Sequence, residues 1–280
     1  WTNPFETKIL SRFMGYTDCL EAESNIKLFV NWLRKMTLIS LQKNKPIGEL
    51  TATLEAISNF MKSLVGNNQE VSIFYDFERD EVIVELGDTQ LPLRLMSSGY
   101  RSLIGMVADI AFRMSLLNPQ LKEKASLLTP GVILIDELDL HLHPKWQWKI
   151  VEDLKRTFPN VQFIATTHAP IIISSCKNGE IINITGDKYE KSHNFGWQVK
   201  DVLSEIMDSD NRSPIMQEKI SAYEKLYEKK MNESLNEQEK EMLISLEKEM
   251  LIKLPESDPI ITLTKLNAIK NKVTKVDENS

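Results

Sequence analysis

The sequence predicts an α/β fold, with a mostly parallel sheet flanked by helices and a helical C-terminal extension. Two observations predict it. Short apolar segments typical of buried strands alternate with segments of helical periodicity in the middle of the chain, which is the pattern of a parallel sheet. After about residue 196, Glu and Lys recur at three- and four-residue spacings, which favours exposed helices.

Residues 1–70 are predicted to form a helical region. Apolar side chains recur at helical spacing over residues 24–44, which predicts a first helix. A second helix is predicted from Ile47 to Val65, and Gly66 is expected to end it.

Residues 71–196 are predicted to form the core of the fold. Alternating apolar residues at 71–77 and 81–86 predict a hairpin of two strands. Helices are predicted at 99–117 and 144–158. The continuous apolar run Gly131–Ile135 predicts a strand buried on both faces, and Val161–Thr166 and Glu180–Ile184 are predicted to be a second and a third buried strand.

Residues 197–280 are predicted to form a helical interaction region. The helices are expected at 197–207, 213–230, 236–253 and 258–275. The lysines of the last helix leave a contact with nucleic acid open, although most of the Glu and Lys faces are expected simply to be solvated.

The composition excludes a general attraction to nucleic acid or anionic membranes, because the net charge is −6 and the sequence pI is about 5.4. No apolar run is long enough to span a membrane. The two cysteines, Cys19 and Cys176, lack metal-binding spacing, which favours reduced thiols. We therefore expect a cytoplasmic protein that does not contact membranes.

Small residues stand at the predicted start of the helix near residue 99, in the sequence Leu95–Ser102. The first N–H groups of a helix are unpaired and lie at the positive end of its dipole, so such a start can bind phosphate. The alternative is an ordinary helix capped by a serine after a turn.

Two adjacent carboxylates, Asp136 and Glu137, follow the apolar strand Gly131–Ile135. They are expected at the functional edge of the sheet, where Asp136 can bind Mg²⁺ and Glu137 can polarise a water molecule. The alternative is a strand that merely ends in acid. His168 follows the next predicted strand and is expected at the same edge, the alternative being a hydrogen-bonded loop histidine.

Four stretches resemble the motifs of ABC-type ATPase heads of the RecF, SMC and OLD group. Met96–Arg101 resembles a variant signature motif, and Ile133–Glu137 resembles Walker B with its catalytic glutamate. Leu138–Pro144 resembles the D-loop, and Thr166–His168 resembles the switch-histidine loop. The order and spacing of the stretches also match this group, so the resemblance implies an ATPase head that uses ATP and Mg²⁺.

The resemblance implies a role for the signature residues in a head-to-head dimer. Ser97, Ser98 and Gly99 would bind the γ-phosphate held by the opposite subunit. The chain has Ser98 where the signature usually has Gly, and Tyr100 where it usually has Gln. These departures concern the phosphate contacts and not the placement of the helix.

The resemblance also implies roles for the three polar residues that follow the strands. Asp136 would bind Mg²⁺, Glu137 would orient the hydrolytic water and His168 would sense the γ-phosphate. A phosphate-binding loop, GxxxxGK[ST], is absent from the 280 residues. Because the three residues are retained, we expect that loop upstream of Trp1; the alternative is a degenerate ATPase.

Further stretches resemble bacterial defence ATPases of the PtuA type, which occur in Septu systems and beside some retrons. They are Gly99–Ala111, Asp139–Gln147 and Trp197–Leu203. The resemblance implies an ATP-gated sensor and scaffold for an HNH nuclease partner of the PtuB kind, with a retron reverse transcriptase and its msDNA as further candidate partners. The alternatives are a scaffold that does not hydrolyse ATP and a RecF- or SMC-like ATPase of DNA repair.

Overall fold

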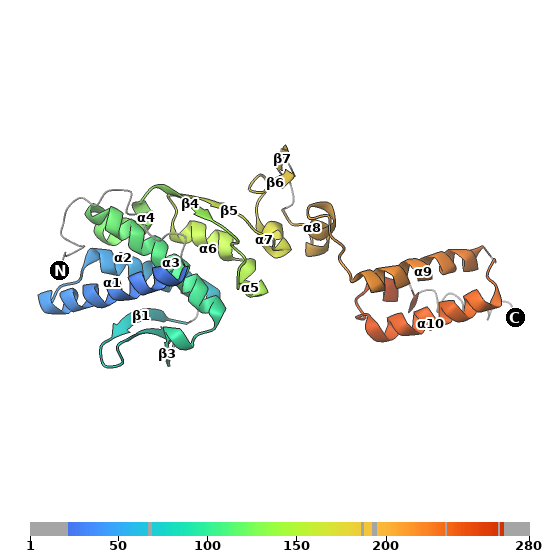
Figure 1. The fold of residues 1–280 in the computed structure, drawn as a ribbon, viewed down its shortest axis with the longest axis horizontal. Helices are drawn as coiled ribbons and strands as arrows, with labels where there is room; N and C mark the ends of the chain where they lie inside the picture. The colour runs from blue at the N-terminus through green and yellow to red at the C-terminus, as the bar shows by residue number, and fades with distance from the viewer. Residues whose placement is uncertain are drawn as a thin grey trace. The chain divides into compact units, whose positions relative to one another are not determined.

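The computed structural model describes residues 22–66, 69–185, 188–191, 195–232, 234–262 and 264–265 (Figure 1). The chain divides into two compact units, of which the first ends at Val202 and the second begins at Leu203. Each unit is described by itself below.

Three long helices form the base of the first unit: α1 (Ala22–Lys43), α2 (Gly48–Val65) and α3 (Ser98–Leu117). All three lie where helical periodicity predicts them. Their apolar faces meet in one core that includes the fully buried Phe60, and a buried pair of hydroxyls, Thr53 and Ser115, joins α2 to α3 at 3.2 Å. Packing in this core fixes the position of α3 and therefore of its first residues.

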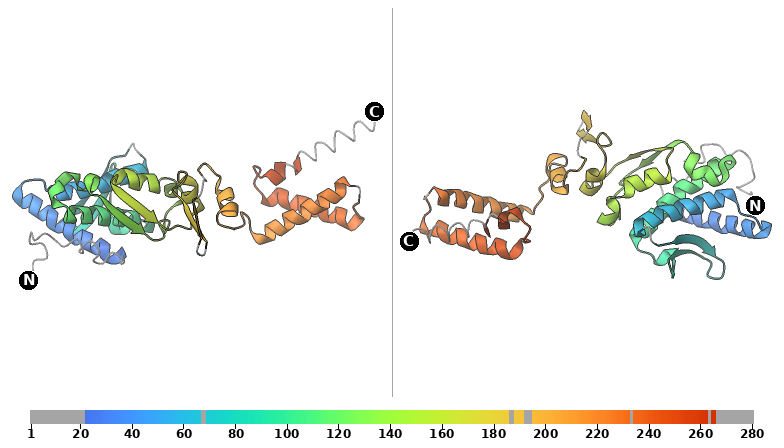
Figure 2. Two further views of the ribbon diagram at one scale, coloured as in Figure 1. Left: turned by 90° about the horizontal axis from the view of Figure 1, so that it is seen from above. Right: turned by 180° about the vertical axis from the view of Figure 1, so that it is seen from behind.

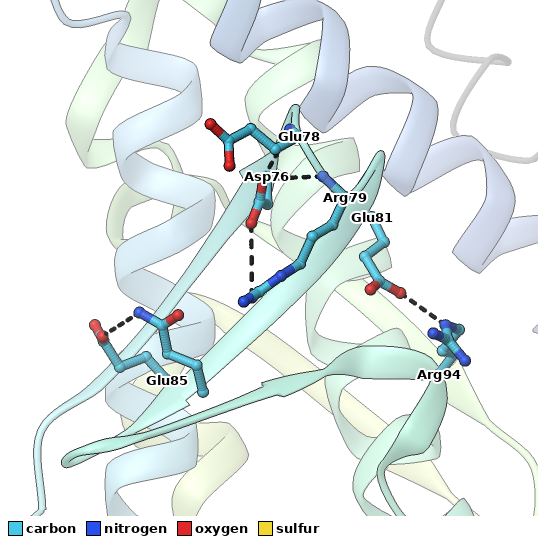
Figure 3. Close-up of polar contacts among 7 residues, drawn as sticks. Asp76, Glu78, Arg79, Glu81, Glu85 and Arg94 are labelled. Carbon is cyan, nitrogen blue, oxygen red and sulfur yellow. Dashed lines mark hydrogen bonds and ion pairs between the residues drawn. The ribbon is translucent and has the colours of Figure 1, made fainter.

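A small antiparallel sheet precedes α3. Its strands are β1 (Val71–Asp76), β2 (Glu81–Leu86) and β3 (Thr89–Pro92), paired in the order β1-β2-β3. Figure 3 shows the polar contacts of this sheet, among them the ion pair of Glu81 with Arg94 at 2.7 Å. Arg94 lies in the short 3-10 helix η2 (Leu93–Leu95), so the ion pair ties the sheet to the turn that leads into α3.

Two strands form a parallel pair: β4 (Gly131–Ile135) and β5 (Val161–Ala165), in a register that places Ile135 beside Ala165. This confirms the predicted strands and their parallel direction. The elements around them are short: η3 (Pro119–Lys124), α4 (Ala125–Leu128), α5 (Pro144–Gln147), α6 (Ile150–Thr157) and α7 (Pro170–Ser175).

The predicted single helix over residues 144–158 is wrong, because the structure has α5 and α6 with a turn at residues 148–149. Trp146 of α5 packs against Tyr100 of α3, while Ile150 of α6 is fully buried in the core. The break allows the two short helices to pack against different residues. Such tertiary contacts cannot be predicted from helical periodicity alone.

The prediction that β4 and β5 are buried on both faces is also wrong for the part of the chain that the structure describes. Ile133 and Phe163 pack against the core, whereas Val132 and Leu134 are 60% and 75% exposed and Ile164 is 52% exposed. Alternate side chains of a strand point to opposite faces, and the described helices cover one face of this pair. Figure 2 (left) shows the two strands in front of these helices.

The third predicted strand does not extend the parallel pair. It forms as β6 (Ile182–Thr185) and pairs with β7 (Lys188–Lys191) in a separate antiparallel hairpin. The residues after this hairpin lead into α8 (Val199–Glu205).

The second unit is a pair of helices, α9 (Pro214–Met231) and α10 (Glu237–Lys253), at the predicted positions. They share a small apolar core that includes Tyr223 and Met250, and Asn236 with Glu239 forms a capping box at the start of α10. Of the last predicted helix, residues 259–262 and 264–265 are helical and the remainder lies outside the described residues. Within the described residues, no helix combines the length and apolarity needed to cross a membrane.

Candidate functional site

The acid pair lies directly after β4, at the carboxyl end of the parallel strands. Asp136 and Glu137 are both exposed. The backbone of Glu137 has φ +50°, in the left-handed region that residues other than glycine rarely adopt. His141, later in the same loop, has φ +62°.

Thr166 joins the two strand ends. Its hydroxyl donates a 2.5 Å hydrogen bond to Asp136 Oδ1 and accepts one of 2.8 Å from the backbone N–H of Glu137. The N–H of Leu138 also donates to the carbonyl of Thr166, at 2.9 Å. The parallel register explains this contact, because pairing Ile135 with Ala165 leaves Asp136 and Thr166 side by side at the next position.

Asp139 makes a second connection between the same two loops. Its Oδ1 accepts hydrogen bonds from the hydroxyl of Thr167 at 2.5 Å and from the backbone N–H of His168 at 3.1 Å. His168 itself is exposed. The structure thus brings Asp136, Glu137 and His168 to one edge of the parallel pair, as the sequence predicts.

At the start of α3, two of the three predicted signature residues are open to solvent and the third, Gly99, is buried. Ser97 is the N-cap residue and Ser98 the first helical residue; both are exposed, and the Ser97 side chain forms no capping hydrogen bond. The alternative of a helix capped by its own serine is therefore not what the structure shows. The first N–H groups of a helix have no partner within the helix, so this start is suited to bind an anion.

Gly99 marks the closest approach between α3 and the loop that follows the acid pair. A Cβ atom on Gly99 would lie 2.7 Å from the carbonyl oxygen of His141 and 2.9 Å from the ring of Trp146. Tyr100 packs edge-on against the same Trp146 ring, with centroids 4.5 Å apart. The stretch Leu138–Trp146 therefore links the start of α3 to the acid pair.

Sequence reasoning missed the parts played by Asp139, Thr166, Thr167 and Trp146. All four lie inside motifs that the sequence identifies, but their partners depend on strand register and loop path. The available signal was a hydroxyl and a carboxylate at equivalent positions after neighbouring parallel strands.

The acid pair suits Mg²⁺ better than a metal held entirely by protein. Among the described residues, no group of three or more His, Cys, Asp or Glu side chains could hold a metal ion. Mg²⁺ needs less, since it binds through one or two carboxylates together with phosphate and water. Asp136 fits this role because it is exposed and Thr166 orients one of its oxygens.

Residues 46–174 match the model of a family described as AAA domain, putative AbiEii toxin, Type IV TA system. The matched segment contains the start of α3, the acid pair and the His168 loop. The resemblance to ATPase heads is thereby confirmed at the level of the domain.

Two curated relatives are similar to this chain over about two thirds of its length. The chain is 36% identical over 180 residues to the retron Vc95 probable ATPase of Vibrio cholerae serotype O1 biovar El Tor, covering 62% of this chain and 34% of that protein. It is 31% identical over 204 residues to the Septu protein PtuA of Bacillus thuringiensis, covering 66% of this chain and 48% of that protein. The chain thus spans between about a third and a half of the length of these two relatives.

Among solved structures, an SMC ATPase chain superposes with a TM-score of 0.38 and 15% identity, over 56% of this chain and 91% of its own length. At that TM-score the superposition carries no argument about function.

Proposed function

We propose that this chain supplies the Walker B, D-loop, switch and signature elements of an ABC-type ATPase that binds ATP between two copies of itself. The observation that supports this most is the hydrogen-bonded edge where Thr166 holds Asp136 and Asp139 holds the His168 loop. Two exposed carboxylates, one of them oriented by a hydroxyl, with a histidine at the same edge suit phosphoryl transfer to water.

Each residue of the edge has a stated task in the proposal. Asp136 holds Mg²⁺, which when bound supplies positive charge to the phosphate oxygens. Glu137 accepts a hydrogen bond from the attacking water and so orients it. His168 contacts the γ-phosphate. The N–H groups at Ser98 and Gly99, at the open start of α3, bind the γ-phosphate of the nucleotide held by the other copy.

A phosphate-binding loop is also required, and the 280 residues contain no GxxxxGK[ST] sequence. The test is therefore made on the gene product in its full natural length. Glu137→Gln is expected to keep ATP binding and to lower the hydrolysis rate at least about 100-fold, because the amide is a poor acceptor for the proton of the attacking water. Glu78→Gln, on the exposed turn after β1, is the matched control and should hydrolyse ATP normally.

The same variant tests the dimer. With ATP and Mg²⁺, Glu137→Gln is expected to accumulate a dimer in light scattering, because nucleotide between the copies is not consumed. A mass that does not respond to ATP, together with unchanged turnover, would instead favour a scaffold that does not hydrolyse ATP.

We further propose that the ATPase acts in anti-phage defence in the bacterial cytoplasm, where its nucleotide state gates a partner nuclease of the HNH type. The names of the relatives, a retron ATPase and a Septu protein, support this setting. A retron reverse transcriptase with its msDNA is a second candidate partner. The helical pair α9–α10 offers a surface for such partners, and its loss is expected to abolish co-purification with the nuclease while ATP hydrolysis persists.

A further inference from the structure

Asp139 is the polar residue of the Leu138–Trp146 stretch that makes contact with the His168 loop. One of its carboxylate oxygens accepts both the Thr167 hydroxyl and the His168 N–H. The Thr167 hydroxyl oxygen in turn accepts the N–H of Ala169, at 3.0 Å. Three consecutive residues after β5 are therefore fixed, directly or through Thr167, by one carboxylate from the loop after β4.

This arrangement fixes the backbone that carries the imidazole of His168. The turn leads straight into α7, whose N-cap residue, Ala169, has no side chain that can cap it. Asp139 and Thr167 accept the N–H groups of His168 and Ala169, the two residues that precede Pro170. The side chain of His168 is exposed, so the backbone at residue 168 sets the point from which it extends and the direction of its Cα–Cβ bond.

The Asp139 carboxylate is itself held in place. Its neighbours on either side of the stretch, Leu138 and Leu142, are buried in the core. Further on, the His141 carbonyl lies against Gly99 of α3. Because the stretch is anchored at several points, its carboxylate can hold the loop that it contacts in one position.

We propose that Asp139 is a positioning residue, which acts on ATP hydrolysis by fixing the His168 loop rather than by touching nucleotide. This inference rests on the proposed function. It predicts that Asp139 and His168 act as one unit, so that removing both costs no more than removing His168 alone.

The test is a double-mutant cycle in the gene product of full natural length. Asp139→Ala and His168→Ala are each expected to lower kcat by about 10- to 100-fold, with the KM for ATP changed less than about threefold. The double variant is expected to match His168→Ala. Asp139→Asn keeps an acceptor oxygen for the N–H of His168 and should recover much of the rate. Asp88→Ala, on the exposed β2–β3 turn, is the control.

Two outcomes overturn the proposal. Additive losses in the cycle would show that Asp139 acts independently of His168, and an Asp139→Ala enzyme with normal kcat would show that it does not act at all. If Asp139→Ala fails to fold, two variants of Thr167 replace it. Thr167→Val removes the hydroxyl, and Thr167→Ser retains it as the control. The proposed function fails separately, namely if Glu137→Gln hydrolyses ATP at the normal rate.

Discussion

The Thr166 hydroxyl and the Asp136 carboxylate lie 2.5 Å apart, across the ends of two adjacent parallel strands. The same hydroxyl accepts the backbone N–H of Glu137, so one small side chain contacts the carboxylate of the first acid and the backbone of the second. Neither acid is buried, and orientation therefore comes from this hydroxyl and not from packing.

Removing the Thr166 hydroxyl is expected to weaken the use of Mg²⁺. In Thr166→Val the shape is kept but Asp136 loses its donor, so we expect ATP hydrolysis to fall about 10-fold or more and the Mg²⁺ needed for half-maximal rate to rise. Thr166→Ser keeps the hydroxyl and is the control. Steady-state phosphate release over a Mg²⁺ titration measures both, and equal rates for the two variants would contradict the assignment.

Adding a methyl group at Gly99 is expected to disturb the junction between α3 and the Leu138–Trp146 stretch. The new Cβ of Gly99→Ala would lie 2.7 Å from a backbone oxygen, that of His141, which cannot swing away as a side chain can. We expect a loss of about 1–3 kcal/mol in the free energy of unfolding, measured in urea. Gly131→Ala meets no atom within 4 Å and should unfold at the normal urea concentration.

The two faces of β4 are expected to differ in their contribution to stability. Ile133 packs against the core, so Ile133→Ala should cost about 2 kcal/mol. Leu134 is 75% exposed, so Leu134→Ala should change stability by less than about 0.5 kcal/mol in the 280-residue chain. Urea unfolding of the pair decides the point: comparable costs would mean that another segment or a second copy covers this face in solution.

The second unit is expected to lose stability in acid through Glu249. The side chains of Lys219 and Lys253 both donate to this carboxylate and lower its pKa from 4.5 to about 2. Because the folded pKa lies below the ordinary value, the contribution is complete above about pH 4.5 and disappears as the pH falls toward 2.

Glu249→Gln should remove this part of the acid dependence and leave stability near pH 2 almost unchanged relative to the natural chain. Because the group is at the surface, added salt should shrink the difference. Circular dichroism of both proteins between pH 7 and 2, at low and high salt, measures it. Parallel acid curves for the two proteins would rule out the contribution.

Much of the fold follows from local pattern. Helical periodicity places α2 and α3, and continuous apolar runs place β4 and β5, because these signals depend on neighbours along the chain. The exposure of Leu134 cannot be predicted from this pattern, because it depends on which layers of the fold cover the strand. The break after Gln147 cannot be predicted from this pattern either, because Trp146 of α5 packs against a residue 46 positions earlier in the chain, Tyr100.

The candidate site divides in the same way. Residue types and their order suffice to place Asp136, Glu137 and His168 at one edge. The partners that orient them, Thr166 and Asp139, become visible only when the register of the two strands is known, because the hydrogen bonds span 29 or 30 positions of sequence.

The left-handed backbone at Glu137 means that stability and the proposed chemistry favour different residues at this position. A residue with a Cβ costs roughly 1 kcal/mol in that conformation, and glycine would adopt it freely. Glu137→Gly should therefore raise the melting temperature of the protein while it removes the carboxylate. An acid at a position where the backbone favours glycine makes the protein less resistant to heat, and the fold alone does not explain why an acid is found there.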